Sequence, residues 1–326
     1  MKKIIKITFL FLFVILLCGC GKVNVSVDSK SLFYMDTYIQ VKLYDCANSE
    51  EIFNKIDNIY KEYHELTDRY NSYDGIVNVY YLNNVLKNKE SIEIDDRLAE
   101  LIQYGIDAYS KTDGYINIAI GNLVDIWKHY REDGTKVPTK DELESANIDI
   151  KNISVKNKVY SKKKDVKIDL GAYAKGYVTE IVGEYLEEQG INKYLINAGG
   201  NVKVGSKYKD NLYKVGLEEP FNTSSVYKII NVENKSIVTS GSYQRYYEVD
   251  NVIYNHIINP KTLYPDNYTK SVTIICDNSK EADILSTYMF MLPIDKGLEI
   301  INNLDGVEAI WYADTIYKSS NFSKYE

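Results

Sequence analysis

Apolar side chains recur at helical spacing in three long segments, and a fourth apolar segment ends before a proline. In the three segments they lie three or four residues apart, which places them on one helix face that faces a core. Asp95 is suited to cap the first turn of the second helix, Gly190 ends the third, and Pro293 follows the fourth. The pattern predicts helices over 52–70, 96–109, 173–189 and 281–292.

Strands account for much of the remaining chain. Tyr38–Leu43 alternates apolar and polar side chains, as a half-buried strand does. The later strands follow one another without regular strand–helix–strand alternation, which favours antiparallel sheets and the α+β class. Neither GxGxxG nor GxxxxGK[ST] occurs, so Rossmann and P-loop folds lose their main support. Strands are predicted over 38–43, 193–204, 213–217, 235–240, 271–276 and 307–312.

The N-terminus has the order of a secretory signal. Three early lysines precede an apolar run from Ile7 to Leu17, which is shorter than the about 20 residues of a membrane-spanning helix. Leu17-Cys18-Gly19-Cys20 resembles the lipobox of bacterial lipoproteins, which implies lipid attachment to Cys20 on the extracytoplasmic face of the cell membrane. We expect a signal peptide over 1–19, a spacer over 20–30 and a single domain over 31–326. An ordinary secreted protein and an uncleaved anchor are the alternatives.

Charge and composition restrict the ligands. The formal net charge is −7, and loss of residues 1–19 with their three lysines makes it −10. An acidic chain is not expected to bind nucleic acid, and it is not expected to bind anionic lipid through a cluster of basic residues. The chain has three histidines, and the only cysteines after Cys20 are Cys46 and Cys276. With so few soft ligands, a disulfide framework or a zinc site is improbable. Any metal is expected to be held by oxygen.

Residues 167–177 combine a carboxylate, small residues and a lysine. A short strand is predicted to lead into the third helix, whose first turn then carries Lys175. Free backbone N–H groups and the positive end of the helix dipole suit this turn to an anion such as a pyrophosphate. A capped helix with a surface lysine explains the pattern equally well.

Three further stretches contain groups that can carry chemistry. Asp283 and Thr287, four residues apart on one helix face, can both reach a hard cation such as Mg²⁺, although ordinary surface residues share this spacing. His256 precedes an Asn-Pro turn and can act as a general base when neutral, although a packed histidine is the better interpretation of this residue alone. The paired glycines of 197–201 suit a ligand's close approach or a plain hairpin turn.

Taken in order, these stretches resemble the motifs of the ApbE family of FAD:protein FMN transferases. The resemblance runs from about residue 35 to 290 and therefore covers most of the chain. The matching segments are Asp113-Gly114-Tyr115-Ile116-Asn117 with Gly121, Leu123 and Trp127; Ile168-Asp169-Leu170-Gly171-Ala172 with Ala174-Lys175-Gly176-Tyr177; Asn197-Ala198-Gly199-Gly200-Asn201; Thr239-Ser240-Gly241 with Tyr243, Arg245 and Tyr246; His256-Ile257-Ile258-Asn259-Pro260; and Ala282-Asp283 with Thr287.

The resemblance implies an α+β transferase domain and a Mg²⁺-dependent reaction. FMN would pass from FAD to a threonine hydroxyl of a target protein, such as a redox-complex subunit or a secreted flavoprotein, with release of AMP. The implied metal ligands are the Ala172 backbone carbonyl and the side chains of Asp283 and Thr287. His256 is the hypothesised base, Asp283 the second catalytic residue, and His64 and His129 receive no role. The implied FAD contacts are Met35, Tyr73, Tyr115, Ile116, Asn117, Asp169, Lys175 and Ile258.

The chain departs from the family pattern at four positions. Asn117 and Asn259 stand where the family has Asp, Asp36 replaces a Gly, and Asn122 replaces a Pro. The two lost carboxylates change the hydrogen bonds that positions 117 and 259 can make.

Three other functions share parts of this pattern. A flavin-binding lipoprotein without transferase activity and an FAD pyrophosphatase that yields FMN and AMP would use the same site. A tethered solute-binding protein would have two α/β lobes, which the strand order does not favour.

Overall fold

An eight-stranded antiparallel sheet forms the centre of the protein. The computed structural model describes residues 26–207 and 211–326. The strand order is β1-β2-β6-β7-β10-β13-β14-β15, and each pair of neighbouring strands is antiparallel. The strands are β1 (Val27–Tyr34), β2 (Thr37–Tyr44), β6 (Tyr194–Ala198), β7 (Asn201–Val204), β10 (Lys235–Gly241), β13 (Ser271–Cys276), β14 (Glu308–Tyr312) and β15 (Ile316–Lys318).

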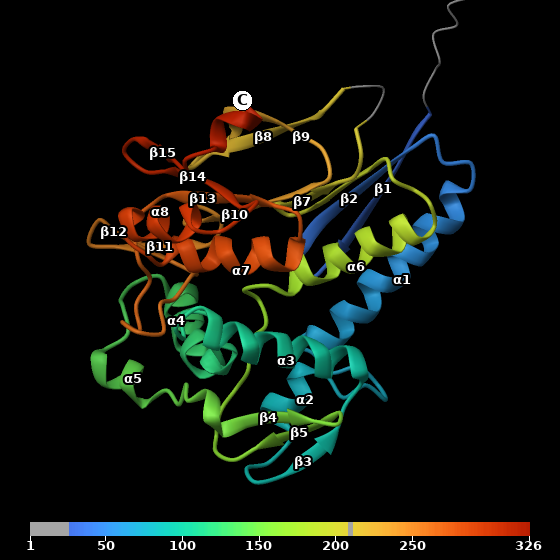
Figure 1. The fold of residues 1–326 in the computed structure, drawn as a ribbon. Coiled ribbons are helices and arrows are strands. Elements are labelled where there is room, and N and C mark those ends of the chain that lie inside the picture. The colour runs from blue at the N-terminus through green and yellow to red at the C-terminus, as the bar shows by residue number, and fades with distance from the viewer. Residues whose placement is uncertain (1–25, 208–210) are drawn as a thin grey trace, which may run out of the picture.

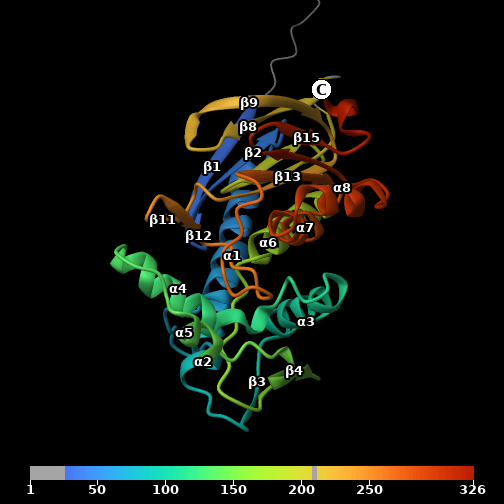
Figure 2. The same ribbon diagram turned by 90° about the vertical axis from the view of Figure 1, so that its left-hand side faces the viewer.

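Helices cover one face of this sheet and a hairpin covers the other. Figure 1 shows α1 (Ser49–Thr67), α6 (Ala174–Glu188) and α7 (Ser279–Phe290) below the sheet, with α8 (Ile294–Asn302) beside α7. The hairpin of β8 (Tyr213–Glu219) and β9 (Asn222–Val232) lies over the opposite face (Figure 2). Neighbouring strand residues therefore enter different cores. Ile274 joins the helix-side core, and Ile275 joins the core under the hairpin.

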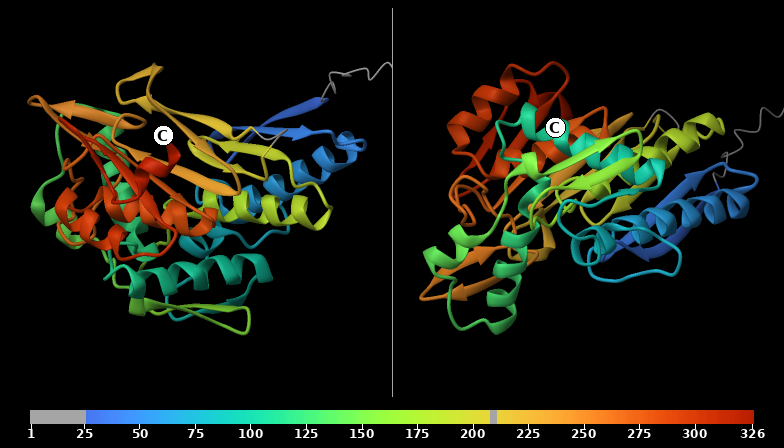
Figure 3. Two further views of the ribbon diagram at one scale, coloured as in Figure 1. Left: turned by 45° about the horizontal axis from the view of Figure 1, so that its top comes forward. Right: turned by 90° about the horizontal axis from the view of Figure 1, so that it is seen from below.

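A second group of helices and short strands lies on the far side of the helix layer (Figure 1). Figure 3 shows these elements from below, where the small sheet β3-β5-β4 lies against the helices. A separate two-stranded ribbon, β11 with β12, precedes His256. The remaining elements are α2 (Val79–Asn84), β3 (Ser91–Glu93), α3 (Asp96–Lys111), η1 (Ile118–Ile120), α4 (Gly121–Asp133), α5 (Lys140–Ser145), η2 (Ile150–Asn152), β4 (Ile153–Lys156), β5 (Val159–Lys162), β11 (Tyr246–Val249), β12 (Val252–Asn255) and η3 (Phe322–Tyr325).

Helices α6 and α7 are held close together by a glycine and a buried ion pair. A Cβ at Gly176 would lie 2.4 Å from the Ser279 carbonyl oxygen, so only glycine fits this crossing. Lys203 Nζ lies 3.0 Å from Glu180 Oε1, and both side chains are only 8% exposed. Glu180 Oε2 also accepts a hydrogen bond from the Ser279 backbone N–H at the start of α7. These contacts set the position of α7, which carries Asp283 and Thr287.

The α+β class is confirmed, and the predicted helices and strands are present with three differences. The helix predicted to Tyr70 ends at Thr67, where Asp68 is extended, and the Tyr70 side chain is 52% exposed. The segment 193–204 forms two strands, because Gly199 and Gly200 both have positive φ and turn the chain between β6 and β7. The short strand expected before the third helix is absent: the Asn83 side chain bonds both the N–H and the carbonyl of Ile168 in place of a neighbouring strand.

The predicted signal peptide and the lipidation residue Cys20 lie outside the described residues. Within 26–207 and 211–326, none of the helices combines the length and apolar character that a membrane span requires.

Candidate active site

Asp283 lies in the first turns of α7 with its carboxylate against the start of α6. The side chain of Asn278 caps α7 by accepting from the N–H groups of Lys280 and Glu281. Asp283 is 4% exposed, and its Oδ2 accepts a 2.7 Å hydrogen bond from the Gly176 N–H. Burial raises the pKa of Asp283, which the charge of Lys175 and the Gly176 hydrogen bond partly offset. An ionised carboxylate in this position is stabilised by any cation that binds next to it.

Oxygen atoms from three segments meet one helical turn further along α7. Thr287 Oγ1 lies 3.4 Å from the Ala172 carbonyl oxygen and 3.4 Å from Ser240 Oγ. Ser240 Oγ is also 2.9 Å from Ser286 Oγ. The TSG motif contains Ser240, but its spacing gave no sign of this contact, which forms only when β10 packs against α7.

This oxygen set fits a hard cation. Asp283 Oδ1 makes no hydrogen bond within the described part of the chain, so it is available as a ligand. The described residues contain no group of three or more His, Cys, Asp or Glu side chains arranged to hold a metal ion. A metal bound here would therefore use one carboxylate, a hydroxyl and a carbonyl, and it would take further oxygens from water or substrate, as Mg²⁺ commonly does.

Lys175 is the second residue of α6, and its ammonium group makes no hydrogen bond or ion pair among the described residues. Its charge acts on both Asp283 and His256. The backbone differs from the sequence prediction, because few N–H groups remain free at this helix start. Ala174 N–H bonds the Leu170 carbonyl, and Gly176 N–H bonds Asp283. The attraction for an anion therefore comes mainly from the Lys175 ammonium group.

His256 follows β12 and is surrounded by cationic side chains. Burial, followed by the charges of Arg245, Lys175 and Arg131, lowers the pKa of His256 to about 4, and a backbone hydrogen bond with Arg245 opposes this shift. Its Nδ1 is buried and has no hydrogen-bond partner within 26–207 and 211–326. The imidazole is therefore neutral at pH 7, and one ring nitrogen is free to accept a proton.

Two arginines complete the cationic group, and the sequence gave a role to neither. Burial and the charge of Arg245 lower the pKa of Arg131. Arg245 Nη2 forms a 2.5 Å ion pair with Asp36 Oδ2 on the β1–β2 turn. Lys175, Arg131 and Arg245 thus gather positive charge around His256, and a bound polyanion would relieve their mutual repulsion.

Asp169 lies in a partly buried ionic network that sequence reasoning missed. Its Oδ2 is 2.5 Å from Arg69 Nη1, and its Oδ1 accepts from the Gly171 N–H at 2.7 Å. Arg69 is 8% exposed and also bonds Asp125 and the Gly121 carbonyl. Asp169 and Arg69 are 100 residues apart in the chain, so no local pattern predicts the pair. Asp169 therefore fixes the loop before α6 in addition to any contact with a ligand.

Met35 and Tyr73 lie together near the C-terminal end of α1. Met35 occupies the β1–β2 turn with a positive φ of 53°, and its backbone N–H bonds His64. The Tyr73 hydroxyl bonds both His64 and Asp68. Tyr115 packs instead against α7, where its ring centroid lies 5.3 Å from that of Tyr288, the residue after Thr287.

The other predicted FAD contacts have side chains that the fold already uses. Ile116 and Ile258 are 1% and 6% exposed and belong to two hydrophobic cores. Asn117 caps the helix η1 and donates a 2.9 Å hydrogen bond to the Ile148 carbonyl. Asn259 donates to Asp266 Oδ2 at 2.6 Å. A carboxylate cannot donate either bond, which accounts for asparagine at 117 and 259.

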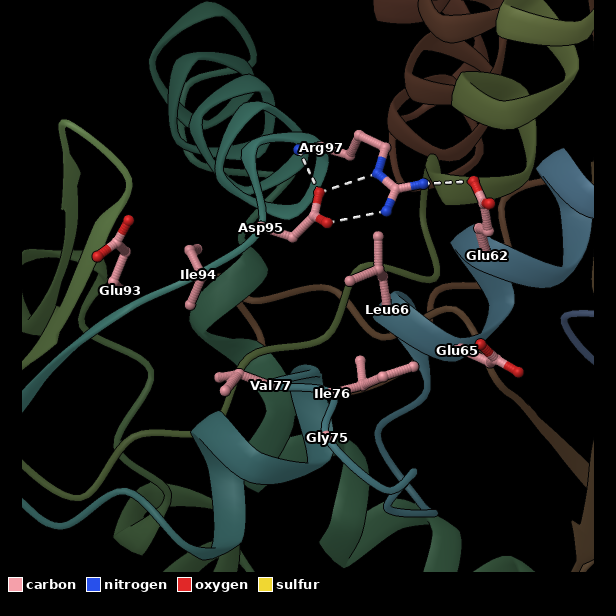
Figure 4. A pocket seen from close by; sticks show the side chains of 10 residues that line it. All are labelled: Glu62, Glu65, Leu66, Gly75, Ile76, Val77, Glu93, Ile94, Asp95 and Arg97. Atoms are coloured by element: carbon pink, nitrogen blue, oxygen red, sulfur yellow. Dashed lines mark hydrogen bonds and ion pairs between the residues drawn. The ribbon is translucent and has the colours of Figure 1, made fainter.

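A pocket of ≈ 330 Å³ lies elsewhere, between the end of α1 and the start of α3. Figure 4 shows Arg97 in it between Asp95 and Glu62, at 2.8 and 2.5 Å. Its one basic side chain is thus paired with carboxylates, and the pocket contains none of the predicted site residues.

Comparison with known proteins gives a consistent result. Residues 35–311 match the sequence model of the ApbE family. An FAD:protein FMN transferase of Klebsiella pneumoniae is 29% identical over 295 residues, covering 87% of this chain and 89% of the relative. The crystal structure of the ApbE protein of Thermotoga maritima superposes with a TM-score of 0.82 and 26% identity, covering 92% of this chain and 99% of that one. The flavin transferase ApbE of Vibrio cholerae superposes with a TM-score of 0.80 and 24% identity, covering 93% and 100%.

Proposed function

The chain belongs to the ApbE family, and we propose on this premise that it is a Mg²⁺-dependent enzyme that transfers FMN from FAD to a threonine hydroxyl of a target protein and releases AMP. The observation that carries the proposal is the placement of two oxygen ligands one helical turn apart on α7. The Asp283 carboxylate, which feels the charge of Lys175, contacts Gly176, and the Thr287 hydroxyl contacts the Ala172 carbonyl. The curated relatives with the name FAD:protein FMN transferase support the flavin chemistry.

The chain's charges suit a dinucleotide that is cut at its pyrophosphate. Lys175, Arg131 and Arg245 would bind the phosphate oxygens and stabilise the charge that develops on the departing AMP. Asp283, Thr287 and the Ala172 carbonyl would hold Mg²⁺, which supplies Lewis-acid stabilisation of the phosphate oxygens when bound. His256 would take the proton of the threonine hydroxyl as its oxygen attacks the FMN phosphorus. The bond from that phosphorus to the AMP phosphate breaks in the same step.

We assign the flavin end of the substrate to Met35, Tyr73 and Tyr115. Met35 lies in the β1–β2 turn, whose Asp36 pairs with Arg245, and Tyr73 in the loop after α1 is connected to Met35 through His64. This arrangement supports a substrate that runs from the turn to the cationic group. The side chains of Asn117, Ile116 and Ile258 are buried or bonded within the protein, so we propose that they shape the site through the backbone.

We also propose that residues 31–326 form one transferase domain, and that lipid on Cys20 tethers it to the extracytoplasmic face of the membrane. The target is a redox-complex subunit or a secreted flavoprotein that carries an acceptor threonine. Labelling with a radioactive lipid precursor tests the anchor, since a Cys20→Ala variant is expected to lose the label.

Incubation of the purified protein with FAD, Mg²⁺ and an acceptor domain tests the reaction. We expect flavin fluorescence on the acceptor in a denaturing gel and AMP in the supernatant. FMN and AMP without labelled acceptor would identify a pyrophosphatase, and FAD binding without AMP would identify a binding protein. Asp283→Ala and excess chelator should each abolish labelling. Unimpaired labelling in either case would refute the metal assignment.

A further inference from the structure

His64 connects two residues that belong to different parts of the proposed flavin site. It lies in the last turn of α1, and its Nδ1 is 3.3 Å from the Met35 backbone nitrogen. Its Nε2 is 3.1 Å from the Tyr73 hydroxyl, which also lies 2.9 Å from Asp68 Oδ2. One imidazole therefore contacts both the β1–β2 turn and the loop after α1.

The available donors fix one arrangement of protons. The Met35 N–H can only donate, so Nδ1 must accept. The Tyr73 hydroxyl has a single proton, which goes to the Asp68 carboxylate, so its oxygen accepts from the Nε2–H group. A neutral imidazole with its proton on Nε2 satisfies every group in the chain from Met35 to Asp68.

Both ends of this chain are anchored. Asp68 Oδ1 accepts from the backbone N–H groups of Tyr70 and Asn71 at 2.7 and 3.0 Å, which holds the loop after α1. At the other end, Asp36 in the same turn as Met35 pairs with Arg245, whose charge acts on His256. The hydrogen bonds run from the loop after α1 to Met35, and the ion pair of the adjacent Asp36 connects this turn to Arg245.

We propose that His64 is a positioning residue for flavin binding, which fixes the Met35 backbone and the Tyr73 hydroxyl relative to each other. The inference rests on the proposed function, because it takes Met35 and Tyr73 as contacts of the FAD substrate. His64 itself acts through these two residues, and it governs the affinity for FAD more than the chemical step.

Three substitutions separate positioning from simple packing. In His64→Asn the amide oxygen can take the place of Nδ1 and keep the bond to the Met35 N–H. In His64→Gln the amide nitrogen can take the place of Nε2 and keep the bond to Tyr73. His64→Ala keeps neither bond. The matched control is His129→Ala, because His129 is exposed and lies outside the predicted site.

The experiment measures FAD affinity by fluorescence titration and the KM and kcat of flavin transfer for each variant. Loss of both bonds should weaken FAD binding and raise KM about 25-fold, with kcat changed less than about threefold, since each bond contributes on the order of a factor of five. The Asn and Gln variants should fall between wild type and Ala, and His129→Ala should match wild type.

Each outcome decides between the two proposals. If the wild type binds no FAD, the proposed function fails and this inference fails with it. If the wild type binds FAD and His64→Ala binds it equally well, only the positioning role is refuted. Equal losses in the Ala, Asn and Gln variants would show that His64 is a packing residue, and a fall in kcat without a change in KM would also overturn the proposal.

Discussion

Gly176→Ala tests how closely the two helices of the active site must approach. The added Cβ would lie 2.4 Å from the Ser279 carbonyl oxygen and 2.5 Å from Asp283 Cβ, whereas ordinary contact begins at 3.4 Å. Helix α7 must therefore move away from α6 by about 1 Å, the difference between 2.4 and 3.4 Å. The hydrogen bond from Gly176 N–H to Asp283 Oδ2, now 2.7 Å, would then be lost.

The free energy of unfolding should fall by about 1.5–5 kcal/mol. Overpacking costs about 1–3 kcal/mol and the lost bond to a charged group about 1.5–3, while alanine returns about 1 through its helix propensity. Flavin transfer should require more Mg²⁺, because the carboxylate moves together with α7.

Urea unfolding and a Mg²⁺ titration of flavin transfer measure these effects. Glu188→Ala is the control on the same helix, because the Glu188 side chain is exposed at the opposite end of α6 from Gly176. The reasoning is refuted if Gly176→Ala is as stable as wild type and needs no more Mg²⁺.

Three further predictions concern the buried charges. Asp283→Asn keeps an acceptor for the Gly176 N–H but removes a buried carboxylate, whose pKa burial raises. In chelator at pH 7, the variant should therefore be more stable than wild type. It should be inactive, and Mg²⁺ should not stabilise it in a thermal melt. Burial lowers the pKa of His256 from its usual 6.5 to about 4 in the folded protein. Between pH 6.5 and pH 4, its imidazole is therefore neutral in the folded protein but protonated in the unfolded chain. Stability from this residue is therefore present above pH 6.5 and decreases by up to about 3 kcal/mol toward pH 4, and urea unfolding of His256→Gln at pH 7 and pH 5 should lack this part of the slope. Glu180→Ala leaves the Lys203 ammonium group buried and unpaired, which should cost about 3–5 kcal/mol in urea unfolding; a Glu180→Ala, Lys203→Met double variant that recovered nothing would contradict this explanation.

Strong periodicity predicted several of the large elements, although helix α4 (Gly121–Asp133) and strand β9 (Asn222–Val232) were missed. Helices α1, α3 and α6 each have one apolar face long enough to show the period, and Ser271–Cys276 was predicted with its observed bounds. The small sheet β3-β5-β4 was missed because strands of three or four residues are too short for alternation to appear. Helices α2 and α5 were also missed, because six residues are too few to show a helical period.

The site was predictable where its residues are close in sequence. Asp283 and Thr287 share a helix face, so their spacing alone suggested a pair of oxygen ligands. The Ala172 carbonyl came only from the family resemblance, since a backbone oxygen leaves no mark in a sequence. Arg69 and Arg131 could not be predicted, because tertiary packing alone brings them to Asp169 and His256.

The hydrogen bond between Asn259 and Asp266 limits how this chain can change. The family has an aspartate at the first position, so a consensus redesign would restore it. In this fold the new carboxylate would face the Asp266 oxygen that now lies 2.6 Å from the asparagine amide. Burial already raises the pKa of Asp266, and a second acid beside it could persist only if the two shared a proton. Aspartate at 259 therefore requires either a shared proton or a substitution at 266, so the two positions are coupled.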